Sequence, residues 1–87
     1  MESLEEIRKT LDEIDYQMAV LFEKRMRQIE KVIAYKKEHA LPTEDVQREV
    51  EMIERNLCYI QSPIYREYYV QMIRKIIALS KDYQQKQ

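Results

Sequence analysis

One apolar pattern dominates the first part of the chain. Its residues recur at gaps of three and four, the spacing that places side chains on one face of an α-helix. No proline or glycine interrupts the pattern before Pro42, and the residue preceding a proline disfavours the helical region. The pattern therefore predicts one long helix over about residues 4–38. Its apolar residues are Leu4, Ile7, Leu11, Ile14, Met18, Leu21, Ile29, Val32 and Ile33.

Two shorter helices are predicted after this segment. Thr43 is a suitable N-cap for a helix over about residues 44–59, in which Val46, Val50, Ile53 and Leu57 share one face. Ser62 and Pro63 suit the N-cap and first position of a third helix, over about residues 63–85. The sequence thus predicts an all-α fold of three helices, forming a single domain over residues 1–87.

The predicted helices differ greatly in length. At 1.5 Å per residue they would measure about 50, 22 and 35 Å, whereas a compact domain of this size is about 30 Å across. The first helix would therefore extend beyond its neighbours with its apolar stripe uncovered. The simplest cover is the same helix of a second copy related by a two-fold axis, so we predict an intertwined homodimer.

Composition excludes several classes of function. Fifteen Lys and Arg balance sixteen Asp and Glu, which argues against nucleic-acid and membrane partners. The absence of glycine argues against phosphate-binding loops, and one His with one Cys gives no zinc-like ligand set, so neither cofactor nor metal is expected. Cys58 has no partner cysteine, and the N-terminal residues are charged, which predicts a cytoplasmic protein in which Cys58 is structural or incidental.

Cations interrupt the apolar stripe of the first predicted helix. Arg25 and Lys36 fall on the stripe, and Arg8 lies at its edge beside Ile7. A buried cation requires either a structural carboxylate or an anionic ligand. The first alternative is a set of salt bridges between helices, and the second is an anion site. Carboxylates available for salt bridges are Asp12, Asp15, Asp45 and Glu49.

Polar residues on the other two helices favour a ligand. Ser80 and Gln84 lie one turn apart in the apolar stripe of the third helix, and they add hydrogen-bonding groups rather than neutralising charge. Asp45, Arg48 and Glu49 share one face of the second helix, either as a solvated face with a local Asp45–Arg48 pair or as part of a site. Together these residues predict a polar pocket for a small dianion inside a helical bundle.

The same residues carry a resemblance to a known family. The segments IRKTLDEID (7–15), LFEKR (21–25) and VIAYKK (32–37) resemble the first helix of the all-helical, AroQ-type chorismate mutases. LPTEDVQRE (41–49) resembles the loop and second-helix signature of that family, and IIALSKDYQ (76–84) resembles the end of its third helix. The resemblance extends over about residues 4–85.

This resemblance implies a dimer that converts chorismate to prephenate without a cofactor. Arg8, donated by the neighbouring protomer, and Arg25 would hold the two carboxylates of the substrate, with assistance from Ser80. Lys36 and Gln84 would flank the ether oxygen of the breaking bond. The second helix would supply the remaining contacts, with Glu49 and Asp45 at the ring hydroxyl and Arg48 at the carboxylate side of the pocket.

Two other functions are compatible with the sequence. An isochorismate pyruvate lyase shares the fold and the cationic clamp, but Glu49 directly after Arg48 favours the mutase. The other is a helical dimerisation or regulatory module without catalytic activity, such as one that docks on another enzyme of the shikimate pathway. Ser80 and Gln84 in an otherwise apolar stripe argue against such a module.

Overall fold

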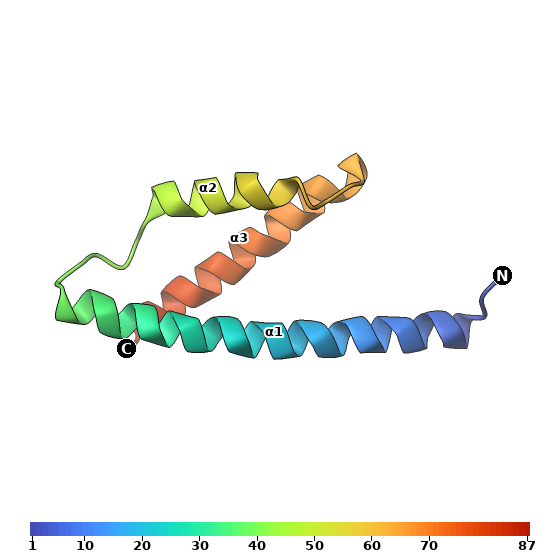
Figure 1. The fold of residues 1–87 in the computed structure, drawn as a ribbon, viewed down its shortest axis with the longest axis horizontal. Coiled ribbons are helices and arrows are strands. Elements are labelled where there is room, and N and C mark those ends of the chain that lie inside the picture. The colour runs from blue at the N-terminus through green and yellow to red at the C-terminus, as the bar shows by residue number, and fades with distance from the viewer.

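Three α-helices make up the protein in the computed structural model, which describes residues 1–87. They are α1 (Leu4–Glu38), α2 (Val46–Leu57) and α3 (Pro63–Gln85), and there are no strands (Figure 1). The predicted all-α class is therefore confirmed. α1 and α3 span the ranges that the sequence pattern predicted, whereas α2 is shorter than its predicted range at both ends.

Hydrogen bonds at both ends define α1. Ser3 and Glu6 form a capping box at its start, in which each side chain accepts a hydrogen bond from the backbone N–H of the other. At its end Ala40 adopts a positive φ of 53°. The N–H groups of Ala40 and Leu41 then donate to the carbonyls of Lys37 and Lys36. This turn, rather than the proline at position 42, ends the helix.

The cap of α2 differs from the sequence prediction. Thr43 lies outside the helix, and Asp45 is the N-cap, because its carboxylate accepts a hydrogen bond from the Arg48 N–H at 3.1 Å. α3 begins as predicted, with Ser62 at the N-cap and Pro63 at the first helical position. The Ser62 side chain makes no capping hydrogen bond.

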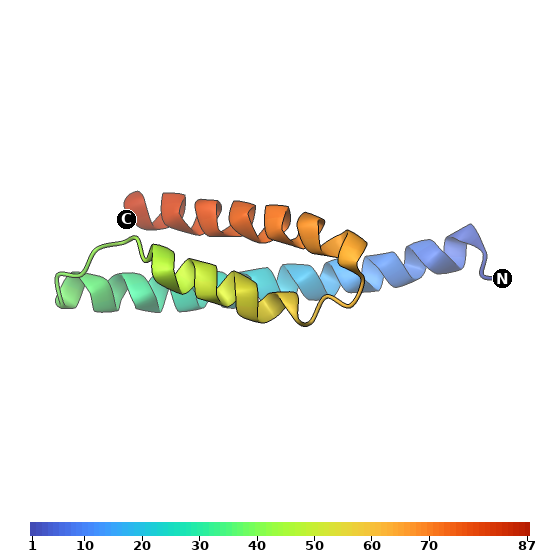
Figure 2. The ribbon, with the colours of Figure 1, turned by 90° about the horizontal axis from the view of Figure 1, so that it is seen from above.

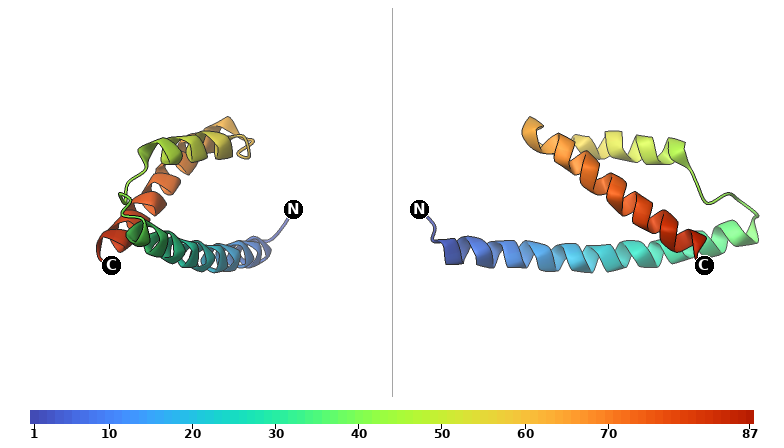
Figure 3. Two further views of the ribbon diagram at one scale, coloured as in Figure 1. Left: turned by 60° about the vertical axis from the view of Figure 1, so that its left-hand side comes forward. Right: turned by 180° about the vertical axis from the view of Figure 1, so that it is seen from behind.

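The helices form an open triangle instead of a closed bundle. α3 packs against α1 near its own C-terminal end and against α2 near its N-terminal end, whereas α1 and α2 have no close contact (Figure 1). Seen from above, the three helices run along a common long direction (Figure 2). The N-terminal end of α1 projects beyond the other two helices (Figure 3). No helix is both long and apolar enough to cross a membrane.

The isolated chain buries little of its apolar surface. Its accessible surface is 7640 Å², whereas a folded monomer of this mass exposes about 5500 Å² by the usual scaling. Its radius of gyration is 16.3 Å, against about 12 Å for a compact domain. Leu11 is 51% exposed and Leu21 is 60% exposed, although both lie on the apolar stripe of α1. Ile73 is the one buried apolar residue.

We expect Asp45→Ala to lower the free energy of unfolding by about 1 kcal/mol, because α2 loses its N-cap acceptor. Thr43→Ala is the matched control and should change stability by less than about 0.5 kcal/mol, because the Thr43 side chain caps nothing. Urea denaturation followed by circular dichroism at one fixed chain concentration measures both. Equal losses in the two variants would contradict the assignment of the cap.

Candidate active site

A cavity of about 320 Å³ lies among the three helices. Its apolar walls come from Ile29 and Val32 of α1, Met52 of α2, and Ile73 and Ile77 of α3. Seven of the eight residues that the sequence singled out also line this cavity. These are Arg25, Lys36, Asp45, Arg48, Glu49, Ser80 and Gln84.

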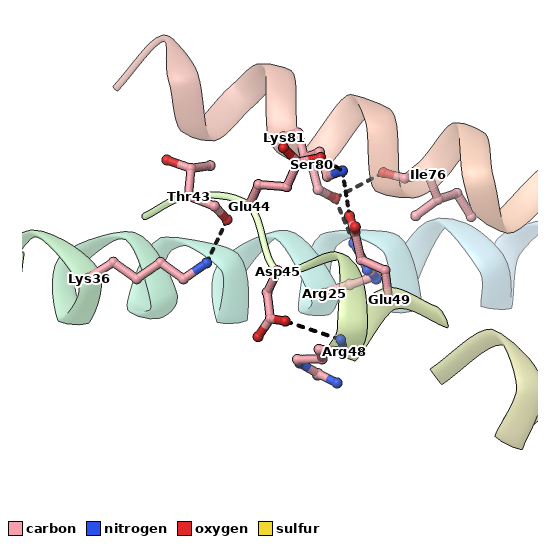
Figure 4. A network of polar contacts seen from close by, with 10 residues as sticks. All are labelled: Arg25, Lys36, Thr43, Glu44, Asp45, Arg48, Glu49, Ile76, Ser80 and Lys81. Carbon is pink, nitrogen blue, oxygen red and sulfur yellow. Dashed lines mark hydrogen bonds and ion pairs between the residues drawn. The ribbon is translucent and has the colours of Figure 1, made fainter. Parts of the chain in front are cut away.

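Arg25 links α1 to α3 in the lining of the cavity. Its guanidinium donates a hydrogen bond of 2.6 Å to the Ser80 hydroxyl, and that hydroxyl donates to the Ile76 carbonyl at 3.0 Å (Figure 4). Ser80 is only 3% exposed. Burial, and secondly the nearby Arg48 cation, lower the pKa of Arg25, and Tyr69 partly opposes this change. Arg25 still remains charged at neutral pH, because arginine titrates far above that range.

Lys36 is held by the loop that follows its own helix. Its ammonium donates a hydrogen bond of 2.7 Å to the Thr43 carbonyl, while its own carbonyl accepts the Leu41 N–H that closes the end of α1. An ammonium group carries three donors, so this contact leaves two for a ligand in the cavity. The loop therefore orients the Lys36 ammonium without neutralising its charge.

Three cations in the cavity have no carboxylate partner. Arg25, Lys36 and Arg48 make no ion pair within 4.0 Å. Arg25 instead donates to a hydroxyl, and Lys36 donates to a backbone carbonyl. Asp45 accepts a hydrogen bond from the Arg48 backbone and does not pair with its guanidinium (Figure 4). The salt-bridge interpretation of these positions is therefore wrong within one chain. Unpaired cations around a partly enclosed cavity are suited to an anionic ligand.

Glu49, by contrast, is paired. The Lys81 ammonium contacts a carboxylate oxygen of Glu49 at 2.7 Å and one of Glu44 at 2.9 Å. Hydrogen bonds to Glu49 and then to Glu44 raise the pKa of Lys81. Sequence reasoning missed Lys81, although it follows Ile77 by four residues, the same spacing that drew attention to Arg25 after Leu21. Lys81 lines the cavity with the seven predicted residues.

Two amide side chains provide neutral hydrogen-bonding groups. Gln84 makes no side-chain hydrogen bond within the chain, so both its amide oxygen and its amide nitrogen are available in the cavity. Asn56, which sequence reasoning also missed, lines the cavity and donates a bond of 3.4 Å to the Tyr69 hydroxyl. The site therefore combines cations, a paired acid and a free amide.

Arg8 is the one predicted site residue that lies elsewhere. It is exposed in the N-terminal half of α1 and does not line the cavity. It precedes Arg25 by seventeen residues on the same helix, a separation of about 26 Å along the axis. No arginine side chain is long enough to cross that distance within one chain.

Comparison with known families accords with this arrangement. The family model described as chorismate mutase type II matches residues 7–85. The chain belongs to the chorismate mutase type II family. The protein is thus an enzyme of the isomerase class, and the matched range includes every residue that lines the cavity. No curated protein and no solved structure gave a match to the chain.

We expect Ser80→Ala to lower the free energy of unfolding by about 1.5–3 kcal/mol, because it leaves the partly buried Arg25 guanidinium without its acceptor. Ser62→Ala is the matched control, since the Ser62 hydroxyl makes no capping bond. Urea unfolding of both variants at equal chain concentration tests this difference. A loss in Ser80→Ala no larger than in Ser62→Ala would refute the structural importance of the Arg25–Ser80 bond.

Proposed function

We propose that the protein rearranges chorismate to prephenate by a Claisen-type [3,3] shift. The observation that carries this proposal is the group of three cations, Arg25, Lys36 and Arg48, that meet in one cavity without carboxylate partners. Membership of the chorismate mutase type II family supports a dicarboxylate as the anion they bind. We place the reaction in phenylalanine and tyrosine biosynthesis, in the cytoplasm, where the free thiol of Cys58 would stay reduced.

The proposed reaction requires the substrate to be positioned and does not require acid–base catalysis. In the rearrangement a C–O bond breaks as a C–C bond forms within one molecule, so no proton is transferred and no covalent enzyme intermediate forms. The cavity accordingly has to hold the flexible enolpyruvyl arm over the ring. Arginine is well suited to this task, because its planar fork grips a carboxylate with two hydrogen bonds and stays charged.

Arg25 is the in-chain half of the proposed carboxylate clamp. Its hydrogen bond to Ser80 uses one of five donors, so the other N–H groups can bind a carboxylate in the cavity. Ser80 holds the guanidinium by this hydrogen bond and is proposed to assist in binding the same carboxylate. Arg48, which lines the cavity from α2, adds positive charge on the carboxylate side.

Lys36 and Gln84 are proposed to act on the ether oxygen. Negative charge grows on that oxygen as the C–O bond stretches, so a cation and an amide donor stabilise the transition state more than the substrate. Lys36 has two free donors after its bond to Thr43, and the Gln84 amide has no partner in the chain. Glu49, with Asp45 nearby on α2, is proposed to accept the hydrogen bond of the ring hydroxyl.

A second copy of the chain is proposed to complete the site with Arg8. The apolar stripe of α1 is exposed, and the chain exposes about 2000 Å² more than a folded monomer of its mass. Covering that excess on each copy would give an interface in the range of obligate homodimers. Two α1 helices side by side around a two-fold axis would bring the Arg8 of each copy toward the cavity of the other.

The direct test is incubation of purified chain with chorismate and a chelator, with loss of chorismate followed by ultraviolet absorbance and the product identified by NMR. We expect prephenate from the wild type, and turnover lowered at least about a hundredfold in Lys36→Ala, because one transition-state donor is lost. No conversion by the wild type would refute the proposed function, and isochorismate would then test for a lyase.

Lys37→Ala is the matched control for Lys36→Ala. Lys37 is the next residue of α1, but its ammonium binds the C-terminal carbonyl of Gln87 at an exposed position outside the cavity. The control should retain turnover within about twofold of the wild type, as expected for a surface substitution. Near-normal turnover in Lys36→Ala would remove Lys36 from the mechanism while leaving the overall function standing.

Mixed dimers test the donation of Arg8. Arg8→Ala and Arg25→Ala should each be nearly inactive alone, because each removes one carboxylate contact from both sites. Unfolding and refolding an equal mixture should restore about a quarter of wild-type activity, since half the dimers are mixed and each has one intact site. If Arg8 acted within its own chain, no mixed dimer would have an intact site, and the mixture would stay inactive.

A further inference from the structure

Lys81 differs from the other cations of the cavity because it is engaged by carboxylates. It lies on α3 directly after Ser80, and its ammonium contacts Glu49 at 2.7 Å and Glu44 at 2.9 Å (Figure 4). The Lys81 and Glu49 side chains are only 26% and 20% exposed, whereas that of Glu44 is 63% exposed. The contact with Glu49 is therefore the better shielded of the two.

The carboxylate of Glu49 poses a problem for a site that binds a dianion. Glu49 lines the cavity together with Arg25, Lys36 and Arg48, so its negative charge would repel the substrate if it were unpaired. Yet a carboxylate is a strong acceptor for a hydroxyl of the ligand. A cation bound to one of its oxygens resolves this conflict, because it cancels the charge and leaves the second oxygen free.

We propose that Lys81 is a positioning residue for substrate recognition, which holds one oxygen of Glu49 so that the other accepts the ring hydroxyl without repelling the dianion. This inference rests on the proposed function, since it takes Glu49 to be the acceptor for that hydroxyl. Lys81 does not need to touch the substrate itself. Two of its three donors are already used by Glu49 and Glu44.

The charges of the cavity agree with this role. Arg25, Lys36, Arg48 and Lys81 supply four positive charges to its lining, and Asp45 and Glu49 supply two negative ones. Within one chain the pair of Lys81 and Glu49 contributes no net charge, so the positive excess of the lining comes from the three unpaired cations offset by Asp45, before a second copy adds Arg8. A lysine is charged at neutral pH, and the two carboxylates raise the pKa of Lys81 further.

Steady-state kinetics with chorismate in a double-mutant cycle test the proposal. In Lys81→Met we expect KM to rise about tenfold, with a smaller change in kcat, because an uncompensated carboxylate then faces the bound dianion. In the Glu49→Gln background the same substitution should change KM by less than about twofold, since no charge remains to be cancelled. Lys81→Arg, which preserves the ion pair, should restore KM to within about threefold of the wild type.

Two further variants keep the test decisive. Lys86→Met is the matched control, because Lys86 lies at the end of α3 and pairs with Asp82 at an exposed position away from the cavity. Lys81→Gln keeps a donor without charge and should raise KM as much as Lys81→Met, so it carries the same prediction if the methionine variant does not fold. Circular dichroism of each variant confirms that it is folded.

The outcomes separate this role from the proposed function. An unchanged KM in Lys81→Met would overturn the role of Lys81. An equal rise in KM in the wild-type and Glu49→Gln backgrounds would also overturn it, by showing that Lys81 acts independently of the Glu49 carboxylate. Either result with normal wild-type turnover leaves the mutase function intact. Absence of turnover in the wild type would instead refute the proposed function on which the inference rests.

Discussion

The length of α1 is the constraint on which the rest of the structure depends. Its 35 residues extend well past both shorter helices, so α3 can cover only part of its apolar face. An open triangle results, in which Ser80 and Ile73 are the only buried residues. This openness leaves room for a cavity between the helices and an apolar stripe outside it. The dimer that we propose would cover the stripe and bring Arg8 to the cavity of its neighbour.

Two of the cations that line the cavity have neutral hydrogen-bond partners instead of carboxylates. Arg25 is held by a hydroxyl and Lys36 by a backbone carbonyl, so both are oriented but remain charged. Neutral partners of this kind fix a cation without cancelling the attraction that a ligand would feel. Lys81 shows the opposite arrangement, because its two carboxylate partners make it a counterion for Glu49. A basic side chain in this cavity is thus free to bind a ligand where its partner is neutral, and it neutralises an acidic side chain where its partner is a carboxylate.

Sequence periodicity predicted α1 and α3 accurately for a physical reason. Spacings of three and four identify the face of a long helix, and the Ser62-Pro63 start signal is local in the chain. Prediction of the helix start was less successful for α2, where two neighbouring residues are both suitable N-caps. Thr43 and Asp45 both suit an N-cap, and the choice of Asp45 depends on how the loop turns after Ala40. The loop conformation cannot be read from residue types alone.

For the site, the sequence by itself singled out eight polar residues, four of which interrupt apolar stripes, and seven of the eight line one cavity. Their partners were decided only by the tertiary structure. Whether Arg25 meets Ser80 or a carboxylate, and whether Glu49 is free or paired with Lys81, depends on how α3 crosses the other helices. Helical spacing specifies the face on which a side chain lies, whereas pairing between helices is set by distances that no local pattern contains.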